Sequence, residues 1–312
     1  MTPIRAPFYA DVADAPEGWT CHWMTAADGL KIRVASWRAE GERGTLLLMP
    51  GRTEYIEKYG NVVGDFLAMG LSVVVIDWRG QGIAERMHPN RDLGHVGRIS
   101  DYQHDVRAMI AHVEAERLAK PLYILGHSMG GGIGFRALEE RHDIAAAAFT
   151  APMWGIQMAA ALRPVAWGLS SIAGPLGFSA LFAPTQKAQA YALRVAVEDN
   201  VLTTDRAQYE RLTRQLVAHP DLALGGPSLH WLGQALREMK RIQSAPAPKV
   251  PSITFLGGDE AIVHPGDIAA RVKSWPGAEL VTYPGAMHEL LIERQEVRSD
   301  ILARLDGLFR PS

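Results

Sequence analysis

Residues 122–134 read LYILGHSMGGGIG, and this stretch decides the fold. Its apolar run is typical of a buried strand, and the residues after Ser128 continue as a helix. Gly126, His127 and Gly130 complete the pattern Gly-x-Ser-x-Gly around the serine. In such a tight turn the serine projects above the sheet, and a Cβ at either glycine would collide with the backbone. The pattern predicts a nucleophilic serine; the alternative is a glycine-rich turn with a structural serine.

Strand-like and helix-like segments alternate along the chain on both sides of this turn. An antiparallel hairpin is predicted at 22–25 and 30–37. Strands are predicted at 45–49, 71–77, 121–125, 145–150, 251–257 and 278–283, and those at 45–49 and 71–77 are predicted to be buried. Helices are predicted at 56–69, 100–118, 266–274 and 293–309. This alternation predicts an α/β fold whose mostly parallel sheet has helices on both faces.

The alternation is interrupted once, by a segment without a convincing strand. Residues 152–245 carry helical stretches broken by proline and glycine. We therefore predict a core formed by 1–151 and 246–312, with 152–245 as a largely helical cap inserted between them.

A serine nucleophile needs a base, and the base needs an orienting acid. In this arrangement the chain order is serine, acid, histidine. His288 follows the last predicted strand, at the sheet edge where ligands bind in open α/β sheets, and we predict that it is the base. Asp259 and Glu260 both follow the preceding strand. Spacing alone does not choose between them as the acid.

Acyl chemistry also needs N–H donors that stabilise an oxyanion. One predicted donor is the backbone N–H of Met129, directly after the serine. The other is the backbone N–H of Arg52, in a loop that Gly51 allows to approach closely. For the Arg52 side chain, contact with substrate and pairing with Glu54 or Glu57 are both open.

The composition bears on partners, disulfides, location and metal sites. The 312 residues are 47% hydrophobic, with 32 basic and 34 acidic side chains, so bulk charge gives no reason to expect a nucleic-acid partner. Cys21 is the only cysteine, so no internal disulfide can form. Residues 1–21 lack the pattern of a signal peptide, from which we expect a cytoplasmic protein. The histidines lack metal-binding spacing, and we expect neither a metal nor a cofactor.

Several longer segments together resemble the α/β-hydrolase superfamily. The resemblance extends to its branch of lysophospholipase L2-like proteins, monoacylglycerol lipases and serine aminopeptidase S33-type hydrolases, and covers roughly residues 20–310. The segments that carry it are MPGRTEYIEKYG (49–60), VVVIDWRGQG (73–82), TAPMWGI (150–156), GGPSLHWLGQAL (225–236) and GAMHELLIE (285–293).

The resemblance implies an α/β-hydrolase fold and a serine hydrolase without a cofactor. Its expected substrate is a small acyl ester, such as a lysophospholipid or a monoacylglycerol. It places Glu260 at the family's acid position, where most relatives have aspartate, with Asp259 one residue earlier. Asp77 and Arg79 correspond to residues that tie loops together near the site.

The apolar segment 157–184 contains a single charge, at Arg163. A membrane span is one interpretation, although three prolines and three glycines interrupt residues 164–186. An apolar lid over the serine fits the composition better. Peripheral contact with a membrane surface is a further hypothesis from the same segment.

Two other functions are compatible with the sequence. An aminopeptidase would need carboxylates in the insert that hold a substrate ammonium group; the candidates are Glu198, Asp199, Asp205 and Glu210. A catalytically silent ligand-binding protein would keep the fold without the chemistry. Oligomeric state, acyl chain length and head group do not follow from the sequence.

Overall fold

The computed structural model describes residues 4–140, 143–158, 168 and 177–310. Within these residues, nine strands form one sheet in the order β1-β2-β3-β5-β4-β6-β7-β8-β9. The strands are β1 (Ile4–Arg5), β2 (Thr20–Thr25), β3 (Lys31–Trp37), β4 (Gly44–Met49), β5 (Leu71–Asp77), β6 (Leu122–His127), β7 (Ile144–Thr150), β8 (Ser252–Gly257) and β9 (Ala278–Tyr283).

The sheet is antiparallel at one edge and parallel elsewhere. β2 and β3 form the predicted hairpin, and β3 pairs antiparallel with β5. From β5 through β4, β6, β7 and β8 to β9 every pairing is parallel. The prediction of a mostly parallel sheet is confirmed. Parallel strands bring their carboxyl ends to one edge, where the loops that carry function meet.

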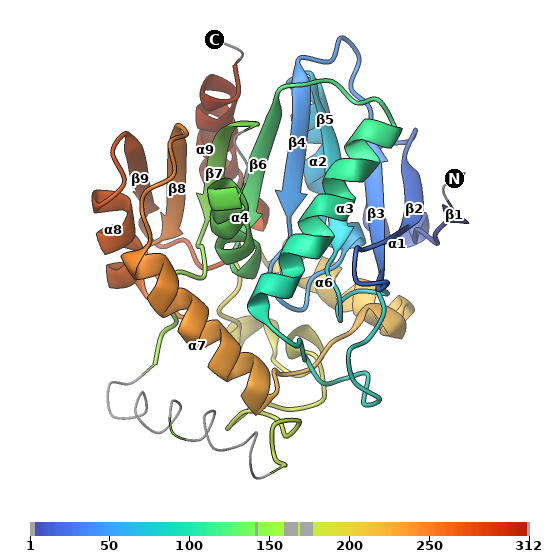
Figure 1. The fold of residues 1–312 in the computed structure, drawn as a ribbon, viewed down its shortest axis with the longest axis vertical. Helices are drawn as coiled ribbons and strands as arrows, with labels where there is room; N and C mark the ends of the chain where they lie inside the picture. Colours follow the sequence, from blue (N-terminus) through green and yellow to red (C-terminus); the bar gives the residue numbers. More distant parts are fainter. Residues whose placement is uncertain (1–3, 141–142, 159–167, 169–176, 311–312) are drawn as a thin grey trace.

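Helices cover both faces of the sheet (Figure 1). The α-helices are α1 (Ala10–Ala13), α2 (Gly60–Ala68), α3 (Tyr102–Ala115), α4 (Met129–Glu140), α6 (Arg206–Ala218), α7 (Leu229–Ser244), α8 (Pro265–Lys273) and α9 (Gln295–Leu308). Short 3-10 helices are η1 (Ile56–Tyr59), η2 (Ile99–Asp101), η3 (Tyr191–Leu193), η4 (Val197–Asp199), η5 (Pro220–Leu222) and η6 (Leu290–Ile292).

Strand β4 shows why residues 46–49 are all apolar. Leu47 and Met49 belong to the core cluster that includes residues of α3, α4 and α8. Leu46 and Leu48 belong to the cluster on the opposite face, with residues of α2 and α9. Successive side chains of a strand point to opposite faces, so a strand covered on both sides needs apolar residues throughout.

The described part of the chain between β7 and β8 includes α6 and α7, which lie beyond the carboxyl ends of the parallel strands (Figure 1). This described part contributes no strand to the sheet, only isolated bridges such as Phe182 with Ser228. Most of the apolar segment 157–184 lies outside the described residues, so its roles as lid or membrane contact remain predictions. Phe178 and Leu181, at its described end, are exposed.

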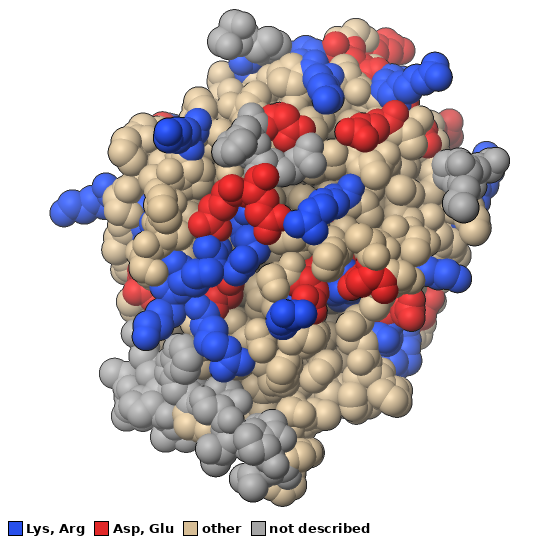
Figure 2. Space-filling model, viewed as in Figure 1, with Lys and Arg blue, Asp and Glu red and all other residues tan. Residues whose placement is uncertain are grey.

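Charges of both signs are mixed on the face shown in Figure 2. Lys and Arg side chains lie among Asp and Glu over its upper and middle parts, and one group of Lys and Arg gathers at the left of the middle part. The mixture agrees with the formal net charge of −2.

Candidate active site

Ser128 lies in the turn between β6 and α4, as the sequence predicts. Its backbone φ is +48°, in the left-handed region that residues other than glycine rarely adopt. The turn is held by hydrogen bonds from the Ser128 N–H to the Thr150 carbonyl (3.0 Å) and from the Met153 N–H to the Ser128 carbonyl (2.8 Å). This conformation turns the half-buried serine out of the strand and toward the carboxyl edge of the sheet.

The glycines flanking the serine leave no room for a side chain. A Cβ at Gly130 would lie 2.0 Å from the carbonyl oxygen of Met49, on the neighbouring strand. A Cβ at Gly126 would lie 2.8 Å from the Gly130 carbonyl oxygen. The predicted reason for glycine at both positions, close approach of backbone to backbone, is therefore confirmed.

Gly130→Ala is expected to lower the free energy of unfolding by about 3 kcal/mol or more, because backbone atoms of β4 must move to admit the methyl group. Gly132→Ala is the matched control in the same helix, since its Cβ would find its nearest atom, the Met153 carbonyl oxygen, at 3.4 Å. That control is expected to be neutral or slightly stabilising. Urea denaturation of both variants measures the difference, and equal midpoints would contradict the steric argument.

His288 and Glu260 come from the loops after β9 and β8 and are in direct contact. The Nδ1 atom of His288 lies 2.7 Å from Oε2 of Glu260. The other carboxylate oxygen accepts hydrogen bonds from the backbone N–H groups of Ile262 (2.6 Å) and Val263 (3.1 Å). Burial opposes ionisation of Glu260, but the contact with His288 and these two N–H groups outweigh it and lower the pKa of the carboxyl.

Asp259, the other candidate acid, points elsewhere. It is exposed, whereas Glu260 and His288 are buried. Its backbone N–H donates to the Ala286 carbonyl (2.9 Å), and no described contact joins its side chain to His288. Of the two adjacent carboxylates, the structure brings only Glu260 to the imidazole.

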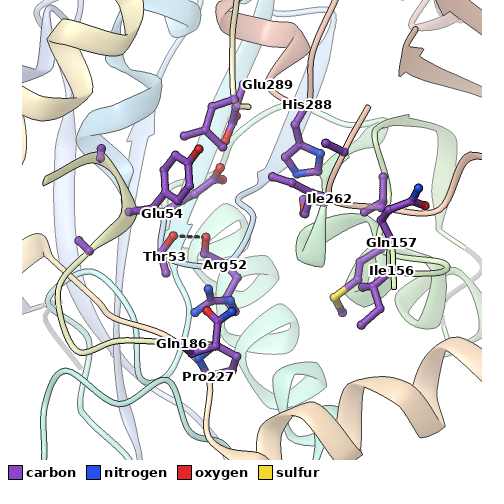
Figure 3. A pocket seen from close by; sticks show the side chains of 18 of the residues that line it. Arg52, Thr53, Glu54, Ile156, Gln157, Gln186, Pro227, Ile262, His288 and Glu289 are labelled. Atoms are coloured by element: carbon purple, nitrogen blue, oxygen red, sulfur yellow. Dashed lines mark hydrogen bonds between the residues drawn. The ribbon is translucent and has the colours of Figure 1, made fainter. Parts of the chain in front are cut away.

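Ser128 and His288 line one cavity of about 660 Å³. Figure 3 shows His288 and Glu289 on one side of it, with Arg52, Gln186 and Pro227 on the other. Much of the wall is apolar, formed by Met153, Ile156, Met158, Leu202, Leu212, Leu216, Trp231, Leu232, Ile262 and Val263. The cavity thus combines a serine and an imidazole with room for an apolar chain.

Of the two predicted oxyanion donors, one lines this cavity and the other is the next residue after Ser128. Arg52 lines it, and Met129 directly follows Ser128 at the start of α4. Among the described residues, neither backbone N–H has a hydrogen-bond acceptor. The next residue, Thr53, has a φ of +66°, and its N–H donates to the Gln81 side chain. Free N–H groups beside a serine are what a developing oxyanion requires.

Residues 40–295, well over half of the chain, match the family described as "Serine aminopeptidase, S33". This chain belongs to that family. The family match includes all the site residues described above, from Arg52 to His288.

Named relatives of this S33 protein act on lipids. Lysophospholipase L2 of Escherichia coli (strain K12) is 28% identical over 299 residues, covering 92% of this chain and 86% of that protein. The monoacylglycerol lipase of Mycolicibacterium smegmatis is 28% identical over 282 residues, covering 88% and 92%.

Solved structures share the fold of this S33 protein. A soluble variant of monoglyceride lipase from Saccharomyces cerevisiae is 19% identical and covers 97% of this chain and 99% of its own, with a TM-score of 0.73. An α/β-hydrolase from Novosphingobium aromaticivorans is 18% identical and covers 93% and 98%, with a TM-score of 0.61. The expected α/β-hydrolase fold is therefore confirmed.

A buried cluster of four ionisable side chains, which the sequence analysis missed, adjoins the site of this S33 protein. Lys58 Nζ contacts Glu54 and lies 2.7 Å from Glu289, and His127 Nε2 lies 3.2 Å from Glu289. Burial disfavours the charged forms, but mutual attraction outweighs it: the pKa values of Lys58 and His127 are raised, and that of Glu289 is well below its usual range. The available signal was that His127 and Glu289 are the sequence neighbours of Ser128 and His288.

This cluster ties three loops of the site together. Glu54 also accepts hydrogen bonds from the Gly51 N–H and the Tyr59 hydroxyl (2.6 Å), which fixes the loop that carries Arg52. The carboxylates of Glu54 and Glu289 lie close to His127, an arrangement that would suit a cation. The Lys58 ammonium already supplies that charge.

The suggested pairing of Arg52 with Glu54 or Glu57 is wrong. Glu54 pairs with Lys58, and Glu57 forms a buried two-point ion pair with Arg33 (2.6 and 2.7 Å). The Arg52 guanidinium instead donates to the Gly225 carbonyl (2.9 Å). Glu57 is bound by Arg33, which is distant in sequence, and Glu54 by Lys58, which lies four residues further along the chain.

Asp77 and Arg79 are structural, as the resemblance implied. Asp77 accepts hydrogen bonds from the backbone N–H groups of Ile56 and Ile83, both at 2.9 Å, and from Arg33 at 2.8 Å. Arg79 forms ion pairs with Asp105 (2.8 Å) and Asp28 (2.7 Å). Neither residue lines the cavity.

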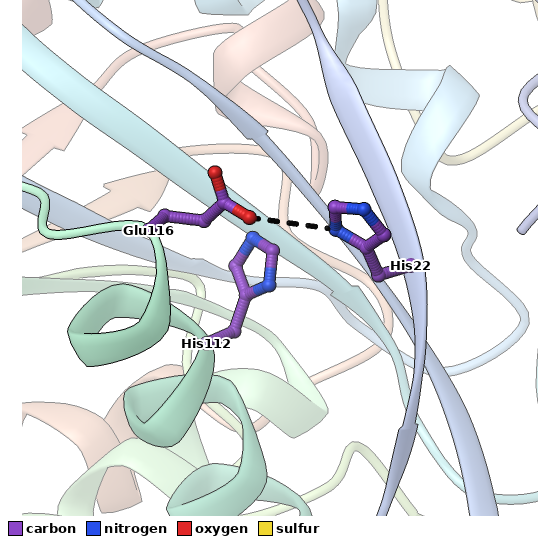
Figure 4. Close-up of side chains that lie close together, drawn as sticks. All are labelled: His22, His112 and Glu116. Carbon is purple, nitrogen blue, oxygen red and sulfur yellow. Dashed lines mark ion pairs between the residues drawn. The ribbon is translucent and has the colours of Figure 1, made fainter. Parts of the chain in front are cut away.

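A second group of possible ligand atoms lies on another part of the sheet (Figure 4). His22 on β2 is 3.7 Å from Glu116, which directly follows α3, and His112 lies beside both. His112 Nε2 hydrogen-bonds with the Ser36 hydroxyl (2.9 Å), and burial lowers the pKa of His112 to about 4. An ion pair and a neutral, hydrogen-bonded imidazole account for these contacts.

None of the helices formed by the described residues is both long enough and apolar enough to cross a membrane.

Proposed function

We propose that this protein is a serine hydrolase that cleaves carboxylic esters of mono-acyl lipids, namely lysophospholipids or monoacylglycerols. One observation carries the proposal: His288, held by Glu260 at 2.7 Å, lines the same cavity as the strained Ser128. The named relatives support the substrate class.

In the proposed reaction, the Ser128 hydroxyl attacks the ester carbonyl carbon and its proton passes to Nε2 of His288. Glu260, on the Nδ1 side, holds the imidazole in the tautomer that accepts this proton and stabilises the resulting cation. The N–H groups of Arg52 and Met129 stabilise the negative charge on the carbonyl oxygen. The proton then leaves with the alcohol, and water releases the fatty acid from Ser128 by the same steps.

Segment 152–245 would act as the cap over this reaction. Its residues Leu202, Leu212 and Leu216 line the cavity, as does Trp231 on α7. These apolar side chains suit an acyl chain and exclude water from the ester.

We expect the purified protein to release fatty acid from lysophospholipids or monoacylglycerols and to leave the amide of the same acyl chain uncut. The measurement is fatty-acid release from a panel of acyl esters, with the matched amide as control. Hydrolysis of aminoacyl amides without hydrolysis of any lipid ester would contradict the proposal.

The aminopeptidase alternative has less support. Glu198 and Glu210 pair with the exposed Arg206, and Asp205 caps α6 through the Gln208 N–H. None of these carboxylates lines the cavity, and neither does Asp199. The silent ligand-binding alternative predicts no labelling by a fluorophosphonate, whereas a working serine site is expected to react with it.

A further inference from the structure

The guanidinium of Arg52 lines the cavity without a carboxylate partner. Its Nη1 donates to the Gly225 carbonyl at 2.9 Å, and its Cζ lies 5.7 Å from the centre of the Trp231 ring. Among the described residues, its other N–H groups have no acceptor and no ion pair includes it. Buried arginines ordinarily meet an anion, because an unpaired charge away from water is costly.

The other charged groups of the cavity already have partners. Glu54 and Glu289 both pair with the Lys58 ammonium, beside His127. Arg52 is therefore the cation of the described cavity lining that still lacks a counter-charge. Burial lowers the pKa of its guanidinium to about 10, so it stays charged near neutral pH.

The length of the Arg52 side chain sets the distance between its charge and the reacting ester. Its backbone N–H is the proposed oxyanion donor, so its side chain starts at the ester carbonyl and extends along the cavity. Figure 3 shows it reaching toward Gln186 and Pro227, away from His288. In a lysophospholipid, the glycerol unit separates the ester from the phosphate by a length similar to that of an arginine side chain.

We propose that the Arg52 side chain binds the phosphate group of a lysophospholipid and makes this class, rather than neutral monoacylglycerols, the preferred substrate. The inference rests on the proposed ester hydrolysis and adds the head-group site to it. A guanidinium offers a planar fork of N–H donors that matches phosphate oxygens, and its free N–H groups face no competing carboxylate. A neutral glycerol head group would leave this half-buried charge uncompensated.

The first test compares kcat/KM for a lysophospholipid with that for the monoacylglycerol of the same acyl chain. Arg52→Met is expected to lower this ratio about tenfold to a hundredfold, the range for loss of hydrogen bonds to a charged group. Arg52→Lys keeps the positive charge but not the planar fork of N–H donors. Its kcat/KM ratio is expected to lie between those of wild type and Arg52→Met. General damage to the oxyanion loop lowers both rates together and leaves the ratio unchanged.

Arg86→Met is the matched control. Arg86 is also half-buried, also has its pKa lowered to about 10 by burial, and donates to the Ala223 carbonyl (3.4 Å), two residues from the acceptor of Arg52. It does not line the cavity. Its replacement is expected to leave the ratio at the wild-type value.

A binding measurement tests the site without catalysis. Calorimetry with wild-type protein compares the octyl ether of glycerol phosphate with the octyl ether of glycerol, neither of which is an ester. Tighter binding of the phosphate compound is expected, with the preference lost in Arg52→Met.

Equal binding of the two ethers by the wild type, or a rate ratio that Arg52→Met leaves unchanged, would overturn the inference. If instead the proposed ester hydrolysis is wrong, neither lipid is hydrolysed. The binding preference for the phosphate ether can still be measured in that case.

Discussion

Ser128→Ala is expected to lower ester turnover by a factor on the order of 10⁴ to 10⁶, the range found when a hydrolase loses its nucleophile. The variant keeps the oxyanion donors and the cavity, so weak residual catalysis is expected to remain. Turnover of a p-nitrophenyl ester measures the loss, and labelling by a fluorophosphonate is expected to disappear with it.

The fold should survive this change, because the hydroxyl of Ser128 has no hydrogen-bond partner among the described residues. Thermal unfolding checks that the variant is intact. Ser244→Ala is the matched control, since Ser244 is exposed at the end of α7 and away from the cavity. A Ser128→Ala protein that folds and turns over ester near the wild-type rate would refute the assignment of the nucleophile.

Glu260→Gln is expected to lower kcat by about 10⁴-fold, as loss of the acid does in serine hydrolases with this arrangement. An amide at this position no longer stabilises the His288 cation and can hold the wrong tautomer. Asp259→Asn, the neighbouring control, is expected to stay close to wild type because its exposed side chain does not reach the imidazole. Equal losses in the two variants would contradict the choice of acid.

The ionic contact of Glu260 also has a readout that does not depend on turnover. Its pKa in the folded protein is below the ordinary value of 4.5, so the unfolded chain binds its proton more readily. The stabilisation is therefore present above about pH 4.5 and is lost as the pH falls through the folded-state pKa. Urea denaturation is expected to show the stability difference between wild type and Glu260→Gln shrinking on acidification.

The parallel strands were predictable to within two residues at each end, whereas β2 begins two residues before the predicted hairpin and β1 was not predicted. Apolar runs at 45–49 and 71–77 correspond to β4 and β5 within one residue at each end. Because both faces of the sheet are covered, the burial requirement applies to every position, and a short local window of sequence carries it.

The predicted helix at 56–69 was only partly correct. Its first turn is the 3-10 helix η1, and α2 begins at Gly60. Within η1, Glu57 and Lys58 are buried, which helical periodicity does not anticipate. They are held there by Arg33 and Glu289, residues far away in the sequence.

The choice between Asp259 and Glu260 also depends on contacts that local sequence does not show. The two residues are adjacent, and spacing places both after β8. The resemblance to known hydrolases favoured Glu260, and the contact with His288 agrees with it. What directs the side chain is the turn that follows, where the N–H groups of Ile262 and Val263 bind the carboxylate.

The sequence by itself determined the alternation of strands and helices and the glycine-flanked turn at Ser128, because both depend on burial and backbone sterics among near neighbours. Only the tertiary structure decided which carboxylate meets His288, that Glu289 pairs with Lys58, and that Arg52 has no carboxylate partner among the described residues. Those outcomes depend on electrostatic contacts between loops from distant strands, and such loops become neighbours only when the sheet has formed.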